Sequence, residues 1–332
     1  MATHGIGILG AARITQKALV EPAKVMPRTR LAVIAARDPG RADAYAKRHG
    51  IDRAVTTYDE VVSASDTEIL YNPLPINLHA EWTIKALEAG KHVLCEKPFA
   101  MNTDEARAML AAAETSGKRL VEAFHYRYHP AFEDCLAWIK DGRIGDVREI
   151  DATFNVAIPD NGSEIRHRVD TGGGAMMDLG CYPLHWALGV MEAAPSSMSA
   201  RAQLTPTGVD ESMQARLEFP TGATATLSAS MAENEPFKAA MTIRGSKGEI
   251  EFINPIAPHN GARLALKIGP ATITHAEISP ISTYTWQLAA LISSLETHEP
   301  LPTEGDMILR QQEALDGIYA AAGLRHLRYL TR

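Results

Sequence analysis

Short apolar runs alternate with helix-patterned segments over the first 125 residues of this 332-residue chain. The runs predict strands at 6–9, 31–36, 69–72, 93–95 and 119–123. Apolar residues at helical spacing between the runs predict helices at 43–48, 78–88 and 103–115, each followed by a glycine that suits a helix end. Strands that alternate with helices are typical of parallel βαβ units. The pattern therefore predicts a doubly wound α/β domain with a parallel sheet over residues 1–125.

The pattern changes after Pro130. From 147 to about 276, short alternating segments rich in Thr, Ala and Val are interrupted by Gly and Pro, which indicates strands. Turns at 220–222 and 245–248 predict two β-hairpins. Helical patterns return at 174–191, 283–296 and 304–326. We therefore expect a second domain over residues 126–332, an α+β domain with a large, mainly antiparallel open sheet.

The N-terminal stretch HGIGILGAARIT contains a literal match to the dinucleotide fingerprint G-x-G-x-x-G, formed by Gly5, Gly7 and Gly10. That fingerprint requires a strand before its first glycine, and only four residues precede Gly5. A strand at 6–9 places the strand-to-helix turn at Gly10–Arg13 instead, with the helix running from about Ile14 onward. The predicted cofactor loop is therefore this later turn.

The end of the second predicted strand reads AVIAARDPGRA. A dehydrogenase that prefers NAD carries an acidic residue there for the ribose 2′-hydroxyl, whereas the 2′-phosphate of NADP calls for arginine. Ala36 stands at the acidic position, and Arg37 and Arg41 follow it, so the sequence favours NADP. Two alternatives remain at this point: the arginines are solvated charges at a helix capped by Asp38, or Asp38 binds the ribose of NAD.

Composition narrows the function further. The chain is 45% hydrophobic and 22% charged with a formal net charge of -7, and no dense Lys/Arg patch offsets that charge, which argues against nucleic acid or an anionic membrane as partner. No long apolar run or export signal is present, so we expect a cytoplasmic protein without a membrane span. Cys95, Cys135 and Cys181 form no CxxC or Cys/His cluster, so the sequence predicts reduced thiols and no bound metal.

Two stretches carry residues suited to chemistry. HVLCEKPF places Glu96, Lys97 and Pro98 directly after a buried strand, at the sheet edge where open α/β proteins bind ligands. TGGGAMMDLGCYPLHW spaces Asp178, Tyr182 and His185 at i, i+4 and i+7, which places them on one face of a helix.

With these residues in hand, the sequence resembles the Gfo/Idh/MocA oxidoreductase family, particularly its glucose-fructose oxidoreductase and dimeric dihydrodiol dehydrogenase branch, which includes D-xylose dehydrogenases. The resemblance covers nearly the whole chain and is carried, in the family's order and spacing, by GILGAARI, AARD, YNPLPINLH, EKP, EAFHYRYHP and GGGAMMDLGCYPLH. Ala12 and Thr15 depart from the family's loop pattern. Tyr182 stands where most members have histidine, and this tyrosine assigns the branch.

The resemblance implies a Rossmann domain and a catalytic set that agrees with the chemistry of the residues. Oxidation of an alcohol requires removal of a hydroxyl proton, and a tyrosine with a pKa near 10 is a poor base at neutral pH. A nearby ammonium favours the phenolate. We therefore expect Tyr182 to act as general acid/base, Lys97 to activate it and bind the substrate hydroxyl, and Asp178 to orient the substrate or Lys97.

The remaining predicted site residues fall into two groups. The residues expected to bind the cofactor are Gly10, Ala12, Arg13, Ile14, Arg37, Arg41, Asn72, Leu74, Pro75, Asn77, His79, Glu96, Lys97, Pro98 and Arg127. The residues expected near the substrate are Phe124, Tyr126, Arg166, His167 and His185.

Several of these residues also have a purely structural interpretation. Asn72–Pro75 and His79 could be a strand exit and a helix start, and Glu96–Lys97 a surface ion pair. His185 could be a satisfied core histidine. Arg127 and His129 could serve the chain's entry into the second domain.

The sequence therefore predicts an NADP-dependent oxidoreductase, with NAD as an alternative cofactor, that transfers a hydride between nicotinamide and a carbonyl or secondary alcohol of a sugar, polyol or dihydrodiol. Alternatives are a transhydrogenase that never releases NADP, an NAD-dependent enzyme that cleaves glycosidic bonds, and a nucleotide-binding regulatory protein without catalysis. Alternating small and β-branched residues, as in GATATLSASM, predict a homodimer or homotetramer that associates through the sheet of the second domain.

Overall fold

The computed structural model describes residues 3–275 and 277–329 of the chain. The chain forms two compact units. The first contains the chain up to Ala100 together with Asp104–His125 and Tyr284–Ile308, and the second contains Met101–Thr103, Tyr126–Thr283 and the chain from Leu309 onward. These units differ from the expected division at residue 125, because Leu288, Leu291 and Ile292 are buried in the same core cluster as the N-terminal strand.

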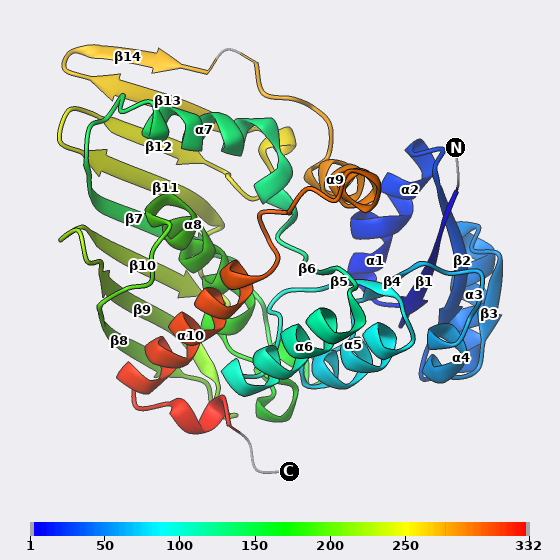
Figure 1. Cartoon of the computed structure of the whole chain (residues 1–332). Coiled ribbons are helices and arrows are strands. Elements are labelled where there is room, and N and C mark those ends of the chain that lie inside the picture. The colour runs from blue at the N-terminus through cyan, green and yellow to red at the C-terminus, as the bar shows by residue number, and fades with distance from the viewer. Residues whose placement is uncertain (1–2, 276, 330–332) are drawn as a thin grey trace. The chain divides into compact units, whose positions relative to one another are not determined.

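The first unit contains a six-stranded parallel sheet in the order β3-β2-β1-β4-β5-β6 (Figure 1). Its strands are β1 (His4–Leu9), β2 (Thr29–Ala35), β3 (Arg53–Val55), β4 (Ile69–Asn72), β5 (His92–Cys95) and β6 (Leu120–Glu122). This order is that of the Rossmann fold, which confirms the predicted doubly wound sheet. The sequence pattern missed β3 because it has only three residues.

Helices cover both faces of this sheet. One face packs on α1 (Arg13–Thr15), the π-helical turn η1 (Gln16–Val20), α2 (Glu21–Val25), α3 (Pro39–His49) and α9 (Thr283–Thr297). The other face packs on α4 (Tyr58–Val62), α5 (His79–Glu88) and α6 (Thr103–Ser116). Because both faces are buried, the strands are nearly continuous apolar runs, as parallel sheets require.

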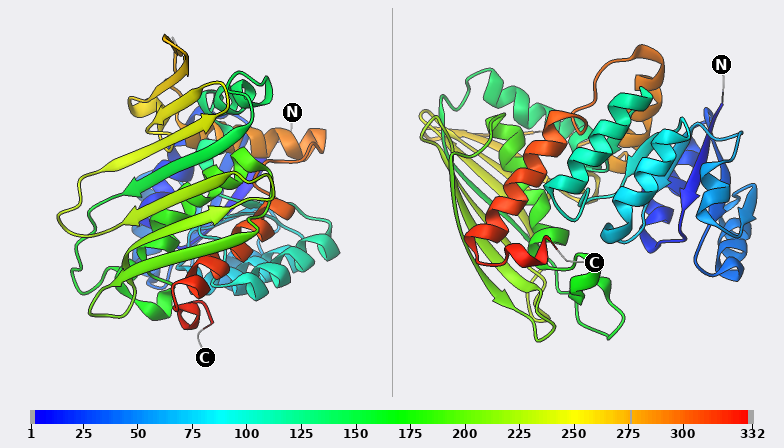
Figure 2. Two further views of the ribbon diagram at one scale, coloured as in Figure 1. Left: turned by 90° about the vertical axis from the view of Figure 1, so that its left-hand side faces the viewer. Right: turned by 60° about the horizontal axis from the view of Figure 1, so that its bottom comes forward.

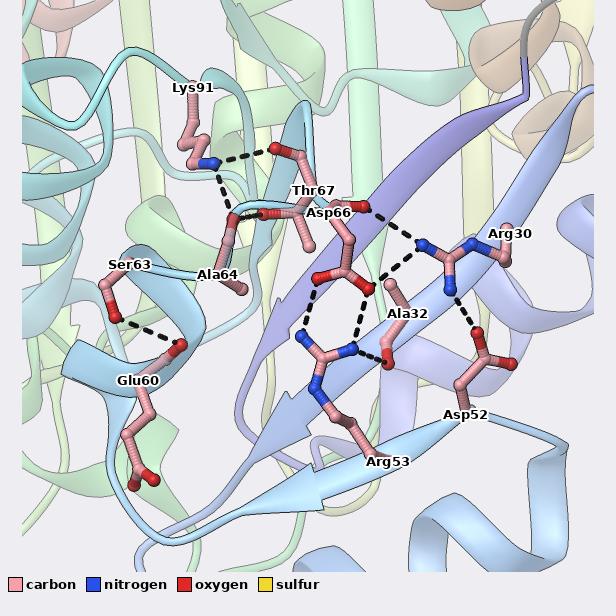
Figure 3. Close-up of polar contacts among 10 residues, drawn as sticks. All are labelled: Arg30, Ala32, Asp52, Arg53, Glu60, Ser63, Ala64, Asp66, Thr67 and Lys91. Atoms are coloured by element: carbon pink, nitrogen blue, oxygen red, sulfur yellow. Dashed lines mark hydrogen bonds and ion pairs between the residues drawn. The ribbon is translucent and has the colours of Figure 1, made fainter.

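A network of ion pairs fastens the amino ends of β2, β3 and β4 (Figure 3). The guanidinium of Arg53 donates to Asp66 Oδ1 at 2.6 Å and to Asp66 Oδ2 at 2.7 Å. Arg30 bridges Asp66, at 3.0 Å, and Asp52, at 2.5 Å. Hydrogen bonding by Arg53 holds the pKa of Asp66 well below its usual range, despite some desolvation. These contacts stabilise the amino edge of the sheet, opposite the edge that carries the predicted cofactor loops.

The second unit contains an eight-stranded mixed sheet in the order β14-β13-β12-β11-β7-β10-β9-β8. Its strands are β7 (Val147–Asn155), β8 (Ser197–Leu204), β9 (Asp210–Glu218), β10 (Thr224–Ser230), β11 (Lys238–Gly245), β12 (Glu249–Ile253), β13 (Arg263–Ile268) and β14 (Ala271–Thr274). The two predicted hairpins are present as β9–β10 and β11–β12. One pair, β7 with β10, is parallel, and the others are antiparallel, so the predicted large and mainly antiparallel sheet is confirmed.

One face of this sheet packs on α7 (Pro130–Lys140), α8 (Cys181–Met191) and α10 (Asp306–Ala321) (Figure 2). Ile150, Ala152 and Phe154 of β7 are buried, whereas the residues between them are partly exposed. That alternation is typical of a sheet with one covered face. The other face is turned toward the viewer in the left view of Figure 2 and carries cross-strand ion pairs such as those of Arg244 with Glu149 and Asp151.

Candidate active site

The turn after β1 has the conformation expected of a cofactor loop. Gly10 directly follows the last residue of β1 and has φ +97, which glycine adopts at little cost. A Cβ at this position would lie 3.1 Å from Leu74 Cδ2, so the lack of a side chain also allows the loop after β4 to pack closely. Helix α1 begins at Arg13, near the predicted start. The turn thus lies at the carboxyl edge of the sheet with no side chain at Gly10, which is where a Rossmann fold binds its dinucleotide.

The other two glycines of the literal fingerprint lie inside β1 and not in the turn. A Cβ at Gly5 would lie 2.0 Å from the carbonyl oxygen of Asp66, and a Cβ at Gly7 would lie 2.4 Å from Leu70 Cδ2. These two glycines therefore permit close packing of the sheet. This explains the literal match without any phosphate contact.

Two arginines flank the carboxyl end of β2. Arg37 is exposed, and the Arg41 side chain donates from Nη2 to the carbonyl oxygen of Ala11 at 2.7 Å. Arg41 is therefore held against the Gly10 turn. Asp38 caps α3, because its Oδ1 accepts a hydrogen bond from the Gly40 amide at 2.9 Å. The cap that the sequence analysis gave as one alternative is thus present, and Arg41 is the arginine that contacts the turn after β1.

The segment after β4 is organised by two buried polar side chains. Asn72 donates to Thr83 Oγ1 at 3.1 Å and accepts from the Leu74 amide at 3.3 Å. The ring of His79 lies 2.7 Å from the carbonyl oxygen of Leu74 and 3.1 Å from that of Pro98. Burial lowers the pKa of His79, which favours the neutral ring. Both residues were predicted to bind the cofactor. In this structure the His79 side chain joins the segments after β4 and β5, and the Asn72 side chain fixes the segment after β4.

Lys97 follows β5 at the same edge of the sheet. The preceding residue, Glu96, is buried and accepts a hydrogen bond from the Tyr71 hydroxyl at 2.7 Å. Its second oxygen lies 3.3 Å from the Lys97 amide. Glu96 is therefore not the exposed partner of a surface ion pair, which was the structural alternative from the sequence. It anchors the segment that carries Lys97 to the core.

A further carboxyl group near this edge was not predicted from the sequence. Glu122, the last residue of β6, pairs in register with Cys95 of β5 and is only 1% exposed. Burial is the main cause that raises its pKa to about 8, and repulsion by Glu96 adds to it, while the Phe99 amide and Lys97 oppose it. Its Oε1 has no hydrogen-bond partner among the described residues. A signal was present, because this glutamate interrupts the apolar run of the strand.

In the second unit, one continuous helical stretch carries both Asp178 and Tyr182. It consists of a π-helical turn, η6 (Met176–Gly180), followed by α8. The sequence analysis assumed a regular α-helix, in which the two residues stack at i and i+4. The wider π turn changes that spacing at Asp178. Such turns occur frequently at functional sites.

Asp178 is held by an arginine that the sequence analysis placed near the substrate. Arg166 Nε donates to Asp178 Oδ2 at 2.6 Å, and Arg166 Nη1 donates to Glu164 Oε1 at 2.8 Å. The two carboxylates raise the pKa of Arg166 further above its usual value, so it stays charged. The adjacent His167 is buried, with Nε2 lying 2.7 Å from the carbonyl oxygen of Ile158.

Tyr182 is only 5% exposed and lies among aromatic rings. Its ring is 5.5 Å from that of Phe154 in an edge-to-face arrangement, and 6.0 Å from that of Tyr126. The Tyr126 hydroxyl is hydrogen-bonded to His185 Nδ1. Tyr182 and His185 thus both contact Tyr126. Burial lowers the pKa of His185 well below its usual value, which is the behaviour of a core histidine.

The other predicted residues occupy varied positions. Arg127 forms an ion pair with Glu133, and His129 caps α7 by accepting from the Ala131 amide at 3.2 Å. Four further predicted cofactor residues, in the segments that follow β1 and β4, are partly buried: Ala12, Ile14, Pro75 and Asn77. Two more predicted residues are buried: Pro98 and Phe124. Lys97 belongs to the first unit and Tyr182 to the second. The site assignments remain predictions.

Three absences concern only the residues that the structure describes. No group of His, Cys, Asp and Glu among them is arranged to hold a metal ion. None of their helices combines the length and apolar character needed to cross a bilayer. Cys95, Cys135 and Cys181 are buried and form no disulfide.

Both halves of the chain match known protein families. Residues 4–124 match an oxidoreductase family with an NAD-binding Rossmann fold, and residues 132–251 match the GFO/IDH/MocA C-terminal domain. The D-xylose 1-dehydrogenase (NADP(+)) 2 of Haloferax volcanii is 31% identical over 319 residues, which cover 95% of this chain and 96% of that protein.

Solved structures agree over the same extent. The aldose-aldose oxidoreductase from Caulobacter crescentus, complexed with glycerol, has a TM-score of 0.89 and 25% identity, with 97% of this chain and 98% of that chain covered. A 3-ketoreductase from Actinomadura kijaniata, in complex with NADP and TDP-benzene, has a TM-score of 0.85 and 25% identity over 96% of this chain and 98% of that chain. These matches confirm the resemblance that the sequence motifs indicated: the chain belongs to the Gfo/Idh/MocA family of oxidoreductases.

Proposed function

We propose that this oxidoreductase uses NADP(H) to transfer a hydride to or from a carbonyl or secondary alcohol of a sugar, polyol or dihydrodiol. The observation that carries the proposal is the carboxyl edge of the parallel sheet. There the Gly10 turn, the Arg41 side chain bonded to Ala11, and the Lys97 segment all follow the ends of parallel strands. Ligands of open α/β sheets bind at this edge.

The residues present fit a bound NADP. Gly10 leaves room for a pyrophosphate to approach the backbone, and Arg37 and Arg41 suit a 2′-phosphate because guanidinium groups match phosphate oxygens. The nicotinamide supplies or accepts the hydride. Use of NADP by the similar D-xylose dehydrogenase and by the similar 3-ketoreductase supports this cofactor choice. NAD remains the alternative.

The protein's own residues handle the proton in this proposal. In reduction, Tyr182 donates its phenolic proton to the substrate oxygen, and in oxidation the phenolate takes the proton back. The ammonium of Lys97 favours the phenolate form of Tyr182 and binds the substrate oxygen that exchanges the proton. Asp178, held by Arg166 at 2.6 Å, orients the substrate or Lys97.

The substrate class is argued from chemistry and from relatives. The similar proteins act on xylose or, by their names, on aldoses, and a family keeps its chemistry while its pocket residues change. A panel of aldoses, inositols and trans-dihydrodiols, screened by absorbance of the reduced cofactor with NAD and with NADP, tests the proposal. Absence of turnover with every member of the panel and both cofactors would overturn it.

A second candidate function is favoured by one specific resemblance. One structural relative is named an aldose-aldose oxidoreductase. In this second candidate, the present protein oxidises one sugar and reduces another while it retains its NADP. The discriminating measurement uses the purified protein with two aldoses and no added cofactor. Production of both a lactone and a polyol supports this candidate, whereas strict dependence on added NADP supports the dehydrogenase.

Two properties complete the proposal. We place the protein in the cytoplasm as a homodimer or homotetramer that associates through the open face of the eight-stranded sheet. On that face β10 presents Thr224, Thr226 and Ser228, small side chains that allow a second sheet to approach. Light scattering coupled to size exclusion gives the mass, and a monomer at micromolar concentration would contradict this part.

A further inference from the structure

A carboxylate outside the predicted site lies at the start of the helix that carries the proposed catalytic residues. Asp210, the first residue of β9, is completely buried. Its Oδ2 accepts a hydrogen bond from the Met176 amide at 2.6 Å, and its Oδ1 accepts from the Tyr319 hydroxyl at 2.7 Å. Both oxygens are thus bound, one by the first residue of the π-helical turn and the other by α10.

The loop of three glycines at 172–174 packs closely against this carboxylate. Gly174 has φ +128, and a Cβ there would lie 2.1 Å from Asp210 Oδ1 and 2.9 Å from the Tyr319 hydroxyl. Any other residue would therefore displace the carboxylate as well as strain the backbone. The amide of Gly174 in turn donates to the carbonyl oxygen of Arg166 at 2.9 Å.

The same contacts lead directly to Asp178. The Asp178 amide donates to the carbonyl oxygen of Gly174 at 3.0 Å, and the Asp178 side chain is held by Arg166. Asp210 thus fixes the loop from which both the backbone and the carboxylate of Asp178 are positioned. Tyr182 follows one turn later on the same helical stretch.

We propose that Asp210, supported by Tyr319, is a positioning residue for the proton-transfer groups, because its carboxylate fastens the first turn of the helix that carries Asp178 and Tyr182. The inference rests on the proposed function of those two residues. An ionised carboxylate at a helix start satisfies amide groups and interacts favourably with the helix dipole. A protonated one loses an acceptor and the charge.

Titration of Asp210 is the readout that separates this role from simple packing. Burial raises its pKa to about 6, while the Met176 amide, the Tyr319 hydroxyl and the cation of Arg328 act in the opposite direction. These groups face Asp210 from the helix start, from α10 and from the residue that follows the turn Arg325–Leu327, and Asp178 is paired with Arg166. Below about pH 6 the carboxyl is neutral in the folded protein. Burial itself favours that neutral form, but the neutral group is a weaker acceptor for the Met176 amide, so we expect the alignment of Asp178 and Tyr182, and not the stability of the fold, to suffer there.

Three variants test the proposal. Asp210→Asn keeps the size but removes the charge, and it is expected to lower kcat about tenfold or more, with the KM for NADPH unchanged and no acid limb near pH 6. Tyr319→Phe leaves the carboxylate but removes the donor that lowers its pKa, so its acid limb moves to higher pH. Glu218→Gln, an exposed carboxylate at the other end of β9, is the matched control and is expected to behave as wild type.

The results separate cleanly. An acid limb that stays in place in both Asp210→Asn and Tyr319→Phe, with kcat unchanged, overturns the inference. If Asp210→Asn does not fold, the position of the limb in Tyr319→Phe decides alone. If the wild type turns over no sugar, the proposed function fails, and hydrogen exchange of residues 172–180 then tests the inference: faster exchange in Tyr319→Phe than in Glu218→Gln supports it, and equal exchange overturns it.

Discussion

Tyr126 and His185 form a buried hydrogen bond that joins the turn His125–Tyr128 to helix α8. The neutral imidazole is favoured because burial lowers the pKa of His185. Tyr126→Phe removes the hydroxyl, so the buried Nδ1 of His185 loses this hydrogen-bond partner. We expect the free energy of unfolding to fall by about 1–3 kcal/mol, measured by urea denaturation. A loss below about 0.5 kcal/mol would mean that the bond contributes little.

Lys97→Ala tests whether the protein is an enzyme or a nucleotide sensor. Loss of the ammonium removes the charge that we propose favours the Tyr182 phenolate, so kcat is expected to fall by a factor of about 10² or more, while NADP(H) still binds. Turnover is followed by absorbance of the reduced cofactor, and binding by its fluorescence. A regulatory protein without catalysis would show no turnover in the wild type and an unchanged biological effect in the variant.

Cofactor choice is tested at the end of β2. Arg37→Ala and Arg41→Ala remove groups proposed for the 2′-phosphate, so each is expected to raise the KM for NADP about tenfold or more and to leave that for NAD nearly unchanged. Arg41→Ala also breaks the bond to Ala11, so its effect on both cofactors is compared with that of Arg37→Ala. Arg48 is exposed near the end of α3, the helix that carries Arg41, and Arg48→Ala is the control. Equal losses for NAD and NADP would refute the proposed role.

Glu122 makes stability depend on pH. Its pKa in the folded protein is raised from 4.5 to about 8, so between these values the folded state holds a proton that the unfolded state has released. Stability is then lost as pH rises through this window, by at most about 1.4 kcal/mol per pH unit. Glu122→Gln should flatten this slope in urea titrations from pH 5 to 8. An unchanged slope in that variant, matched by the exposed control Glu114→Gln, would show that another group is responsible.

Sequence patterns predicted the regular parts of the fold because periodicity reports burial. Strands such as β4 and β1 and the hairpins of the second unit alternate or cluster their apolar residues in the way that their surroundings require. The pattern missed β3 and α4, which are short. Local periodicity carries little signal in such elements.

The candidate site was predictable only where motifs carry it. Lys97, Asp178 and Tyr182 stand in recognisable motifs, whereas Asp210 lies in an ordinary segment 34 residues after Met176, whose amide it binds at the start of the helix. The bond of Arg166 to Asp178 and the link of His79 to Pro98 likewise depend on tertiary folding. No pattern in one sequence reports which distant groups meet, so these contacts required coordinates.

The return of α9 to the first unit has a consequence for biosynthesis and for dissection of the protein. Leu288, Leu291 and Ile292 belong to a core that begins at the N-terminal strand, and α10 follows them in the chain to complete the second unit. A ribosome must therefore extrude almost the entire polypeptide before either hydrophobic core is whole. A fragment that stops at residue 125 would lack α9 and would expose the apolar surface that α9 covers. The complementary fragment would carry α9 without the core in which it packs.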